Sequence, residues 1–401
     1  MTFFSSVRKI LQQNIREYGM YIALFVIMII FTITTNGTFI SSRNIVNLVN
    51  QTGYIAVLAI GMTLVIIIRH IDLSVGFLAG FLGAIAAIAM ADPKVVQAGM
   101  SLPIYIVIPM TLGLGILAGL ITAFLVAQMK IPSFVASLAG WLIYRGAILV
   151  VTESTGTIII NDDAFNAIGN GFIPDIPDIG ILPGIHKLTL ILGIVAIVAM
   201  ILGELNDRKK KLEYNFEVLP TEIFILKIVF TSSIIGGITW VLAGYQGLSW
   251  TAVIVLVVTL IYNFIMAQTV LGRHIYAIGG NPDAAELSGI SVKKLIYVVF
   301  GSMGMLSALS GILFASRLQS ATTTAGNLFE LDAIAAAYVG GVSAAGGVGK
   351  VVGSIIGALV MTSLTSGMNL MGIGISYQYL VRGAVLAAAV IFDVATRNTG
   401  K

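Results

Sequence analysis

The chain has 401 residues, of which 58% are hydrophobic and only 10% are charged. In a typical soluble protein roughly a quarter of the residues are charged. This composition therefore excludes a soluble globular fold and predicts a protein embedded in lipid. The net charge of +4 does not indicate nucleic-acid binding, because the basic residues are distributed according to the expected membrane topology. The absence of cysteine excludes a disulfide framework, a thiolate metal site and a cysteine nucleophile.

Apolar runs recur along the whole chain, and a helix needs roughly 20 apolar residues to cross the hydrocarbon core of a membrane. We expect an all-α, polytopic protein with ten to twelve transmembrane helices, forming a single domain over residues 1–401. Long charge-free runs lie at residues 18–42, 73–91, 103–129, 188–203, 228–272 (two helices), 295–316 and 351–381; shorter candidates lie at 54–68, 134–152, 333–349 and 383–392.

The orientation follows from the basic residues, which gather in the loops on one side of the expected bundle. This distribution predicts that both termini are cytoplasmic. Residues 153–187 then form the longest external loop, and residues 204–222, with "DRKKK", form a cytoplasmic loop. Residues 272–294 form a second cytoplasmic loop. Small-residue spacings such as Gly115/Gly119 and Gly353/Gly357 allow close helix packing, but none identifies a dimer interface.

The segment "IDLSVG" (residues 71–76) follows Arg69 and His70, between two apolar runs. An unpaired Asp72 is costly in hydrocarbon, so we expect Arg69 and His70 to neutralise it and Ser74 to cap the next helix. In one interpretation, these residues only separate two membrane helices at the membrane surface. The other places Asp72 and Ser74 on the transport pathway, where a discontinuous helix opens.

The loop at 272–294 contains "GGNPDAAELSGI", which has the signals of a short helix. Asn at the cap, Pro at the first position, Asp in the first turn and Gly at the end predict about two turns. Its small apolar face would be exposed, which is typical of a docking element; packing on its own chain is the alternative. The residues of this predicted element are Asn281, Pro282, Asp283, Ala284, Ala285, Leu287 and Gly289.

The segment 316–337 is expected outside and carries neutral hydrogen-bonding groups, among them Gln319 and Asn327. Such groups suit a sugar, although a polar loop that caps a helix explains them equally well. Glu330 and Asp332 indicate a helix start. Arg145 and Arg382 fall within apolar runs and are expected to reach the outer membrane surface.

Enzymatic machinery is not recognisable in the sequence. The three His residues are widely separated and have no metal-ligand spacing. The run "GGVSAAGGVGK" (340–350) does not match the spacing of a phosphate-binding loop and lacks the following Ser or Thr. We therefore expect no catalytic residue, no metal, no cofactor and no nucleic-acid partner.

Five stretches together resemble the membrane permeases of bacterial ABC sugar importers, over residues 39–393: "GRHIYAIGGNPDAAELSGISV", "IDLSVG", "IPSFVASLAG", "ELDAIAAAYVGGVSAAGGVGKVVGSIIGA" and "GMNLMGIGISYQYLVRGAVLAAAVIFD". The branch is that of ribose, galactose, xylose and multiple-monosaccharide permeases, and the last two groups look most similar.

This resemblance implies a homodimeric permease in the bacterial inner membrane. It implies a separate cytoplasmic ATPase as the motor and an external sugar-binding protein that delivers a pentose or hexose. Residues 281–290 would be the coupling helix that docks on the ATPase. A secondary transporter of a small neutral solute, driven by an ion gradient, is the alternative, and it requires intramembrane acids such as Asp72 and Asp332. A membrane enzyme has no support in the sequence.

Overall fold

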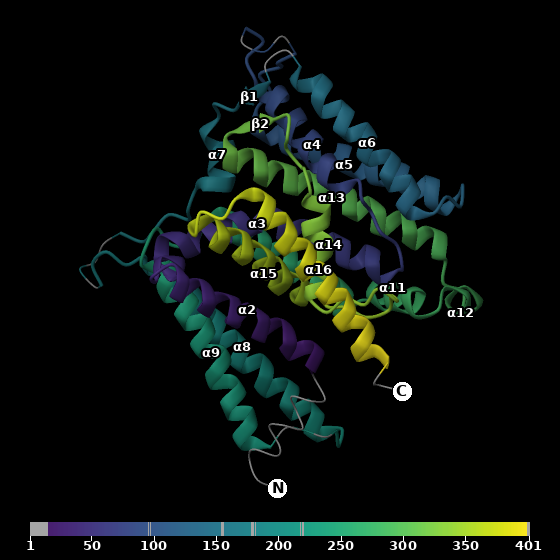
Figure 1. Ribbon diagram of the computed structural model, residues 1–401. Helices are drawn as coiled ribbons and strands as arrows, with labels where there is room; N and C mark the ends of the chain where they lie inside the picture. Colours follow the sequence, from purple (N-terminus) through teal and green to yellow (C-terminus); the bar gives the residue numbers. More distant parts are fainter. Residues whose placement is uncertain are drawn as a thin grey trace. The chain divides into compact units, whose positions relative to one another are not determined.

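The computed structural model describes residues 15–398 except for residues 95, 97, 154, 155, 178, 179, 181, 217 and 219, and it is built almost entirely of helices (Figure 1). The predicted all-α membrane fold is confirmed. Within this described part, nine helices are long and apolar enough to cross a membrane, and residues 19–34 and Val75–Met90 form two shorter apolar helices. The basic leader at residues 1–14 lies outside the described residues.

Contacts between residues divide the chain into two compact units. The first unit comprises Met1–Ile15, Ile40–Asn47 and Phe172–Ser249, and the second comprises Arg16–Phe39, Leu48–Gly171 and Trp250–Lys401. That residues 1–401 act as one domain remains a prediction.

The first unit contains a pair of long helices, α8 (Lys187–Glu213) and α9 (Thr221–Ala243). They pack closely where Gly193 meets Thr239, because a Cβ atom on Gly193 would lie only 2.2 Å from the Thr239 methyl group. Both helices expose most of their apolar side chains, as expected of helices that face lipid. The charged segment that joins them begins on α8 itself, since α8 continues through the "DRKKK" run to Glu213.

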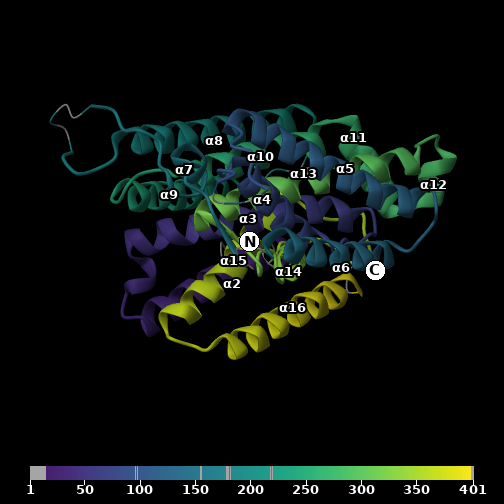
Figure 2. The ribbon, with the colours of Figure 1, turned by 90° about the horizontal axis from the view of Figure 1, so that it is seen from above.

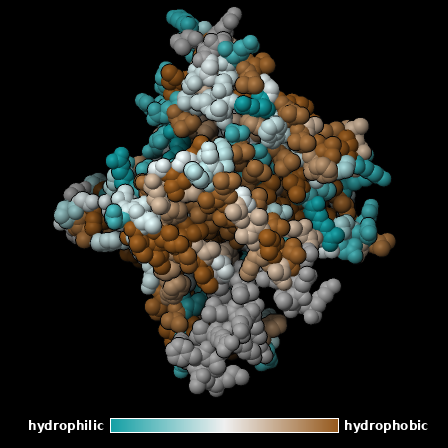
Figure 3. Space-filling view, in the orientation of Figure 1, coloured by the Kyte–Doolittle hydropathy of each residue, from teal (hydrophilic) through white to brown (hydrophobic). Residues whose placement is uncertain are grey.

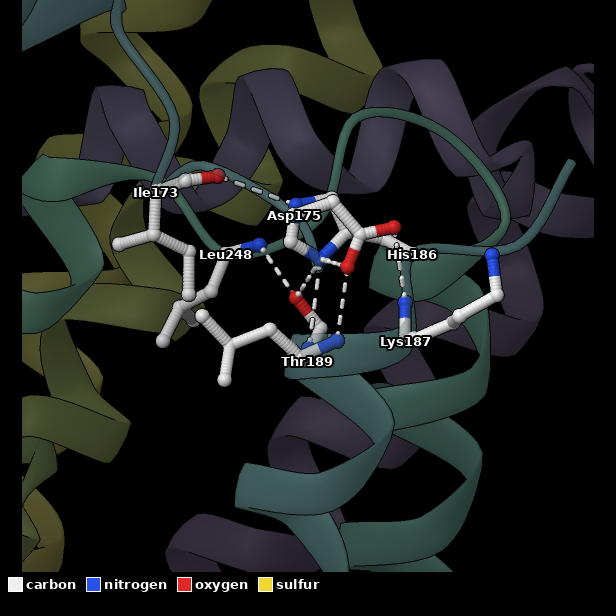
Figure 4. Close-up of polar contacts among 7 residues, drawn as sticks. Ile173, Asp175, His186, Lys187, Thr189 and Leu248 are labelled. Atoms are coloured by element: carbon white, nitrogen blue, oxygen red, sulfur yellow. Dashed lines mark hydrogen bonds and ion pairs between the residues drawn. The ribbon is translucent and has the colours of Figure 1, made fainter. Parts of the chain in front are cut away.

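The N-terminus of α8 is closed by side chains from the preceding loop (Figure 4). The Asp175 carboxylate accepts hydrogen bonds from the backbone N–H groups of Lys187 and Leu188, at 3.1 and 2.9 Å. His186 caps the same turn, because its Nδ1 accepts from the N–H of Thr189 at 3.3 Å. Desolvation raises the pKa of Asp175, but the N–H groups of Leu188, Lys187 and Ile176 outweigh it, so the pKa lies below its ordinary value.

The second unit contains a two-stranded sheet and the remaining helices, apart from Ile15, Ile40 and Ser42–Asn47, which belong to the first unit. In chain order, its elements are α2 (Ile15–Thr34), η1 (Thr38–Ile40), α3 (Ser42–Ile67), α4 (Val75–Met90), α5 (Ile104–Ala127), α6 (Ser133–Thr152), β1 (Thr157–Ile159), α7 (Asp163–Asn170), α10 (Trp250–Gln268), α11 (Val270–Gly280), α12 (Pro282–Leu287), α13 (Val292–Leu318), β2 (Ser320–Thr322), α14 (Phe329–Val339), α15 (Val351–Leu370) and α16 (Ile375–Asn398).

The core of the second unit forms where α13 packs against α5 and α4. Glycines make this contact unusually close: a Cβ atom on Gly304 of α13 would lie 2.0 Å from the Gly115 carbonyl oxygen of α5. Close backbone approach is the usual role of small residues in membrane helices. The predicted spacing Gly115/Gly119 therefore packs within the chain, and so does Gly357 of α15, which meets the Ala336 carbonyl of α14.

Three expected segments differ in the structure. The run at 333–349 was expected to be a helical span, but α14 has only 11 residues, about 16 Å at 1.5 Å per residue. The expected external loop at 153–187 contains β1 and α7, and β1 pairs antiparallel with β2, Thr157 facing Thr322. The expected loop at 272–294 is largely helical, because α11 precedes the predicted short helix.

Hydrophobic side chains also cover broad areas of the molecular surface, as the face in Figure 3 shows. On α6 they include Phe134, Leu142, Ile143 and Val150, all exposed in the isolated chain. An apolar surface of this extent is stable only in contact with lipid or another protein.

Candidate functional site

The predicted short helix is present as α12, beside α11 at the margin of the second unit in both views (Figures 1 and 2). The Asn281 side chain caps it by accepting from the Ala284 N–H at 3.1 Å, and Pro282 occupies the first turn. Gly289 follows the helix with φ +85°, a conformation that glycine adopts without steric cost. All the local signals for this helix are thus confirmed.

The exposed face of α12 differs from the predicted one. Leu287 is 90% exposed, and Asp283 and Ala284 are also exposed. Ala285, in contrast, is only 4% exposed, so the expectation that it contributes to an exposed apolar face is wrong. Its carbonyl oxygen accepts from the Ile290 N–H at 3.0 Å, which folds the chain back after the helix. The exposed apolar side chains of α12 are therefore Ala284 and Leu287, and Leu287 is the larger of the two.

Asp72 and Ser74 lie together in the break between α3 and α4, and both are almost completely buried. Asp72 accepts two hydrogen bonds from Ser74, from its N–H at 2.9 Å and its hydroxyl at 2.6 Å. Ser74 therefore does not cap α4 with its side chain, contrary to expectation. Arg69 does not neutralise Asp72 as expected either: its Nε donates to the Gly279 carbonyl oxygen at 2.7 Å, and Nη2 donates to that of Gly280.

Gln319 and Asn327 flank β2 and have no hydrogen bond to Asp72 or Ser74, although Gly326, next to Asn327, packs against Gly76 at the start of α4. Gln319 ends α13 in a left-handed conformation, and its carbonyl oxygen accepts from the Ile160 N–H at 2.9 Å. Both side chains are exposed. The four pathway candidates thus form two groups, one buried and one exposed, and only Asp72 and Ser74 bond to each other.

A buried carboxylate that the sequence had indicated only as a helix start lies at the beginning of α14. Glu330 is 3% exposed, and its Oε1 accepts from Trp141 Nε1 at 3.0 Å, while Oε2 lacks a hydrogen-bond partner among the described residues. Its neighbour is Gly76 of α4, on which a Cβ atom would lie 2.1 Å from Oε2. An ionisable residue within an apolar run was the available signal, since such residues are functional candidates by default.

Two cations within apolar runs also find protein partners. Arg382 of α16 forms an ion pair with Asp332 of α14 at 3.2 Å and donates to the Thr365 hydroxyl at 2.8 Å. That Arg382 reaches the outer membrane surface stays a prediction. Arg145 of α6 donates to the Thr323 carbonyl at 2.6 Å and lies over the Phe77 ring. These contacts bind both guanidinium groups within the second unit.

The site thus combines a capped, exposed helix with a buried break that is joined to it through Arg69. Among the described residues, His, Asp and Glu side chains nowhere gather in threes at a potential metal site.

Comparison with known proteins gives the same family as the motifs. The model of the family described as "Branched-chain amino acid transport system / permease component" matches residues 44–390. The xylose transport system permease protein of Haemophilus influenzae is 38% identical over 390 residues, which cover 97% of this chain and 99% of the relative. The corresponding protein of Escherichia coli K12 is 38% identical over 386 residues, covering 96% of this chain and 93% of the relative.

The ribose import permease protein of Haemophilus influenzae is more distant, with 35% identity over 380 residues that cover 94% of this chain and 93% of the relative. No solved structure gives a significant match. The resemblance of the motifs to sugar-importer permeases is confirmed by these relatives. The chain is a multi-pass membrane protein and belongs to the family of transport-system permease components.

Proposed function

We propose that the chain is the transmembrane permease subunit of an ATP-driven ABC importer of monosaccharides, with xylose as the first candidate. The names of its relatives, which are xylose and ribose permeases that match nearly the whole chain, support this substrate class. Two copies would form the pathway. A cytoplasmic ATPase would drive it, and an external binding protein would deliver the sugar.

The exposure of Leu287 is the observation that best supports docking of the ATPase on α12. A leucine side chain that is 90% exposed on a helix with a well-formed cap is ready to enter an apolar cleft of a partner. Asp283 and Glu286 flank it and are exposed, so the rim of such a cleft is expected to be basic. Burying one leucine side chain contributes about 1.5–3 kcal/mol.

This reasoning predicts that Leu287→Asp weakens ATPase binding roughly ten- to hundredfold or more, because the apolar contact is lost. The measurement is capture of the ATPase encoded beside this chain by the tagged permease, with sugar uptake in vesicles as the second readout. Leu212→Asp is the matched control: Leu212 is 54% exposed and lies on α8, in the other predicted cytoplasmic loop. Equal capture by both variants would refute docking through α12.

The alternative function is transport of a small neutral solute driven by an ion gradient. Such a transporter needs an intramembrane acid that can bind and release the ion. Asp332 is paired with Arg382 and Asp72 is bonded by Ser74, so the candidate for such an acid is Glu330, whose Oε2 lacks a partner among the described residues. Uptake by the chain alone in proteoliposomes, driven by an imposed ion gradient, would support the alternative instead.

The substrate is tested in the complete system. Vesicles that contain the permease and its ATPase, with binding protein outside, are given pentoses, hexoses and the branched-chain amino acids named in the family description. We expect uptake of xylose or a related monosaccharide that requires ATP. Uptake of an amino acid in place of sugars would contradict the proposed substrate class.

The orientation is tested separately. We propose that α12 and both termini are cytoplasmic. Because the chain has no cysteine, a single thiol introduced as Asp283→Cys can be labelled without background. An impermeant thiol reagent is expected to leave it unlabelled in intact cells and to label it after the cells are opened. Labelling in intact cells would contradict the orientation and the docking of the ATPase together.

A further inference from the structure

Arg69 ends α3 in a backbone conformation that normally belongs to glycine. Its φ is +65°, and the hydrogen bonds around it are those of a Schellman cap: the Arg69 N–H donates to Ile66 at 2.9 Å and the His70 N–H donates to Val65 at 3.0 Å. A residue with a Cβ atom pays a steric cost in this left-handed region that glycine avoids. The reason for an arginine at this position therefore lies in its side chain.

The guanidinium group of Arg69 binds the end of the neighbouring helix. Its Nε donates to the Gly279 carbonyl oxygen at 2.7 Å, and Nη2 donates to the Gly280 carbonyl oxygen. These are the last two residues of α11, directly before Asn281, the cap of α12. Carbonyl groups at the end of a helix lack partners within the helix and carry partial negative charge, so a cation is bound well there.

A third segment joins the same point. The Gly347 N–H, in the loop between α14 and α15, donates to the Ile67 carbonyl oxygen at 2.9 Å. Gly279 fits against both, since a Cβ atom there would lie 2.0 Å from the Ile67 oxygen and 2.5 Å from the Gly347 nitrogen. We call Ile67, Arg69, Gly279, Gly280 and Gly347 the Arg69 junction. At Gly279, the close approach leaves no room for a side chain between the Ile67 carbonyl and the Gly347 N–H.

The Arg69 junction connects the segment before the docking helix with the segments that lead into α4 and α15. Along the chain, Arg69 is followed by Asp72 and Ser74, which begin α4. Tyr276 of α11 donates to the Gly349 carbonyl oxygen at 2.7 Å, one residue before Lys350, the cap of α15. These contacts tie the end of α11, directly before α12, to the segments that precede α4 and α15.

We propose that Arg69 is a positioning residue that transmits the movement of α12 to the α3–α4 break and to the α14–α15 loop. The proposal rests on the proposed function, in which the ATPase moves α12. Arg69 contacts neither ATP nor sugar in this role. It holds two backbone carbonyls of the docking segment with a planar, two-point contact that a flexible or neutral side chain does not reproduce.

Arg69→Gly separates this role from a structural one. Glycine is the residue best suited to the left-handed position, so the variant is expected to insert and to resist heat as well as the wild type. The ATPase is expected to remain bound and to hydrolyse ATP. Sugar uptake should fall about tenfold or more, so the ratio of ATP hydrolysed to sugar transported rises by the same factor.

Two further variants sharpen the test. Lys130→Gly is the matched control, because Lys130 is also a cation with a left-handed backbone, φ +56°, after the end of α5, and its side chain is exposed. It should transport sugar with the wild-type ratio. Arg69→Lys keeps the charge but loses the two-point contact, and its ratio should lie between those of the wild type and Arg69→Gly.

Each remaining outcome overturns the proposal. Wild-type uptake by Arg69→Gly would show that the side chain transmits nothing. Loss of the ATPase from Arg69→Gly would show that Arg69 is needed for assembly rather than for transmission. Sugar uptake by wild-type vesicles that does not depend on the ATPase would overturn the proposed function itself. This result is distinguishable from the others because it requires no substitution.

Discussion

The ion pair between Asp332 of α14 and Arg382 of α16 is enclosed by the helices of the second unit, with side chains only 17% and 21% exposed. At the observed separation of 3.2 Å, two unit charges attract each other by about 5 kcal/mol for an effective dielectric constant of about 20. Desolvation offsets much of this attraction in the intact pair. Removing one partner nevertheless leaves the other charge buried and unpaired, which costs about 3–5 kcal/mol.

We therefore expect Asp332→Asn to lower the free energy of unfolding by about 3–5 kcal/mol, and Arg382→Met to lower it by a similar amount. The double variant should lose clearly less than the sum of the two, because neither charge is then left alone. The assay is denaturant titration of the purified protein in mixed micelles, read as a double-mutant cycle. Among the described residues, the Arg382 Nε has no hydrogen-bond partner. The coupling free energy measured by the cycle therefore comes from the Nη1 contact with Asp332 and the Nη2 contact with Thr365.

The pair between Glu204 and Lys227 in the first unit is a control, because it is short, 2.6 Å, but far more exposed, at 31% and 46%. Glu204→Gln should cost at most about 1 kcal/mol. Strictly additive losses from Asp332→Asn and Arg382→Met would refute the reasoning. Transport gives a second test: the double variant should still take up sugar, whereas an ion-coupled transporter that uses Asp332 would lose uptake in the well-folded double variant.

Two further predictions concern stability. Gly304→Val should lower the free energy of unfolding by about 1–3 kcal/mol or more in the same titration, because its side chain meets the Gly115 carbonyl at the α5–α13 contact. Gly113→Val on α5 has open space around it and should change stability much less; equal losses would contradict the role of the close contact. Asp175→Asn should reduce hydrogen-exchange protection at the start of α8 at neutral pH. Because the pKa of Asp175 is lowered by folding, the stabilisation is complete above the ordinary pKa of about 4 and is lost as the pH falls through the lower folded-state pKa. A wild-type protein that lost this protection between pH 8 and pH 5 would contradict that assignment.

Features encoded by neighbouring residues could be predicted from the sequence. The apolar runs marked nearly all the helices because lipid requires each backbone to satisfy its own hydrogen bonds. The start and end of α12 were also predictable, since Asn281, Pro282 and Gly289 act within nine residues of one another. Which side of α12 is exposed was not, and Ala285 proved to be buried.

Features that join distant segments were missed. Arg69 was expected to pair with Asp72, three residues away, but its partners are 210 and 211 residues along the chain. Arg382 pairs with Asp332 across 50 residues, although both had been noticed separately. An apolar run indicates that an ionisable group within it lies inside the membrane, but it does not say which of several partners reaches that group. The glycines at 340–350 indicate a break between two helices, and α14 does end at Val339 while α15 begins at Val351; only the short length of α14 was not predicted.

The glycine-lined contact between α5 and α13 limits how such a permease can change shape. Sliding of one helix along the other would bring larger side chains against backbone positions that only glycine fits. Gly304 abuts the Gly115 carbonyl oxygen in this way, with no space for a Cβ atom between them. We infer that α5 and α13 move together as one rigid body. Any opening and closing of the permease then has to come from movements of other helices around this pair.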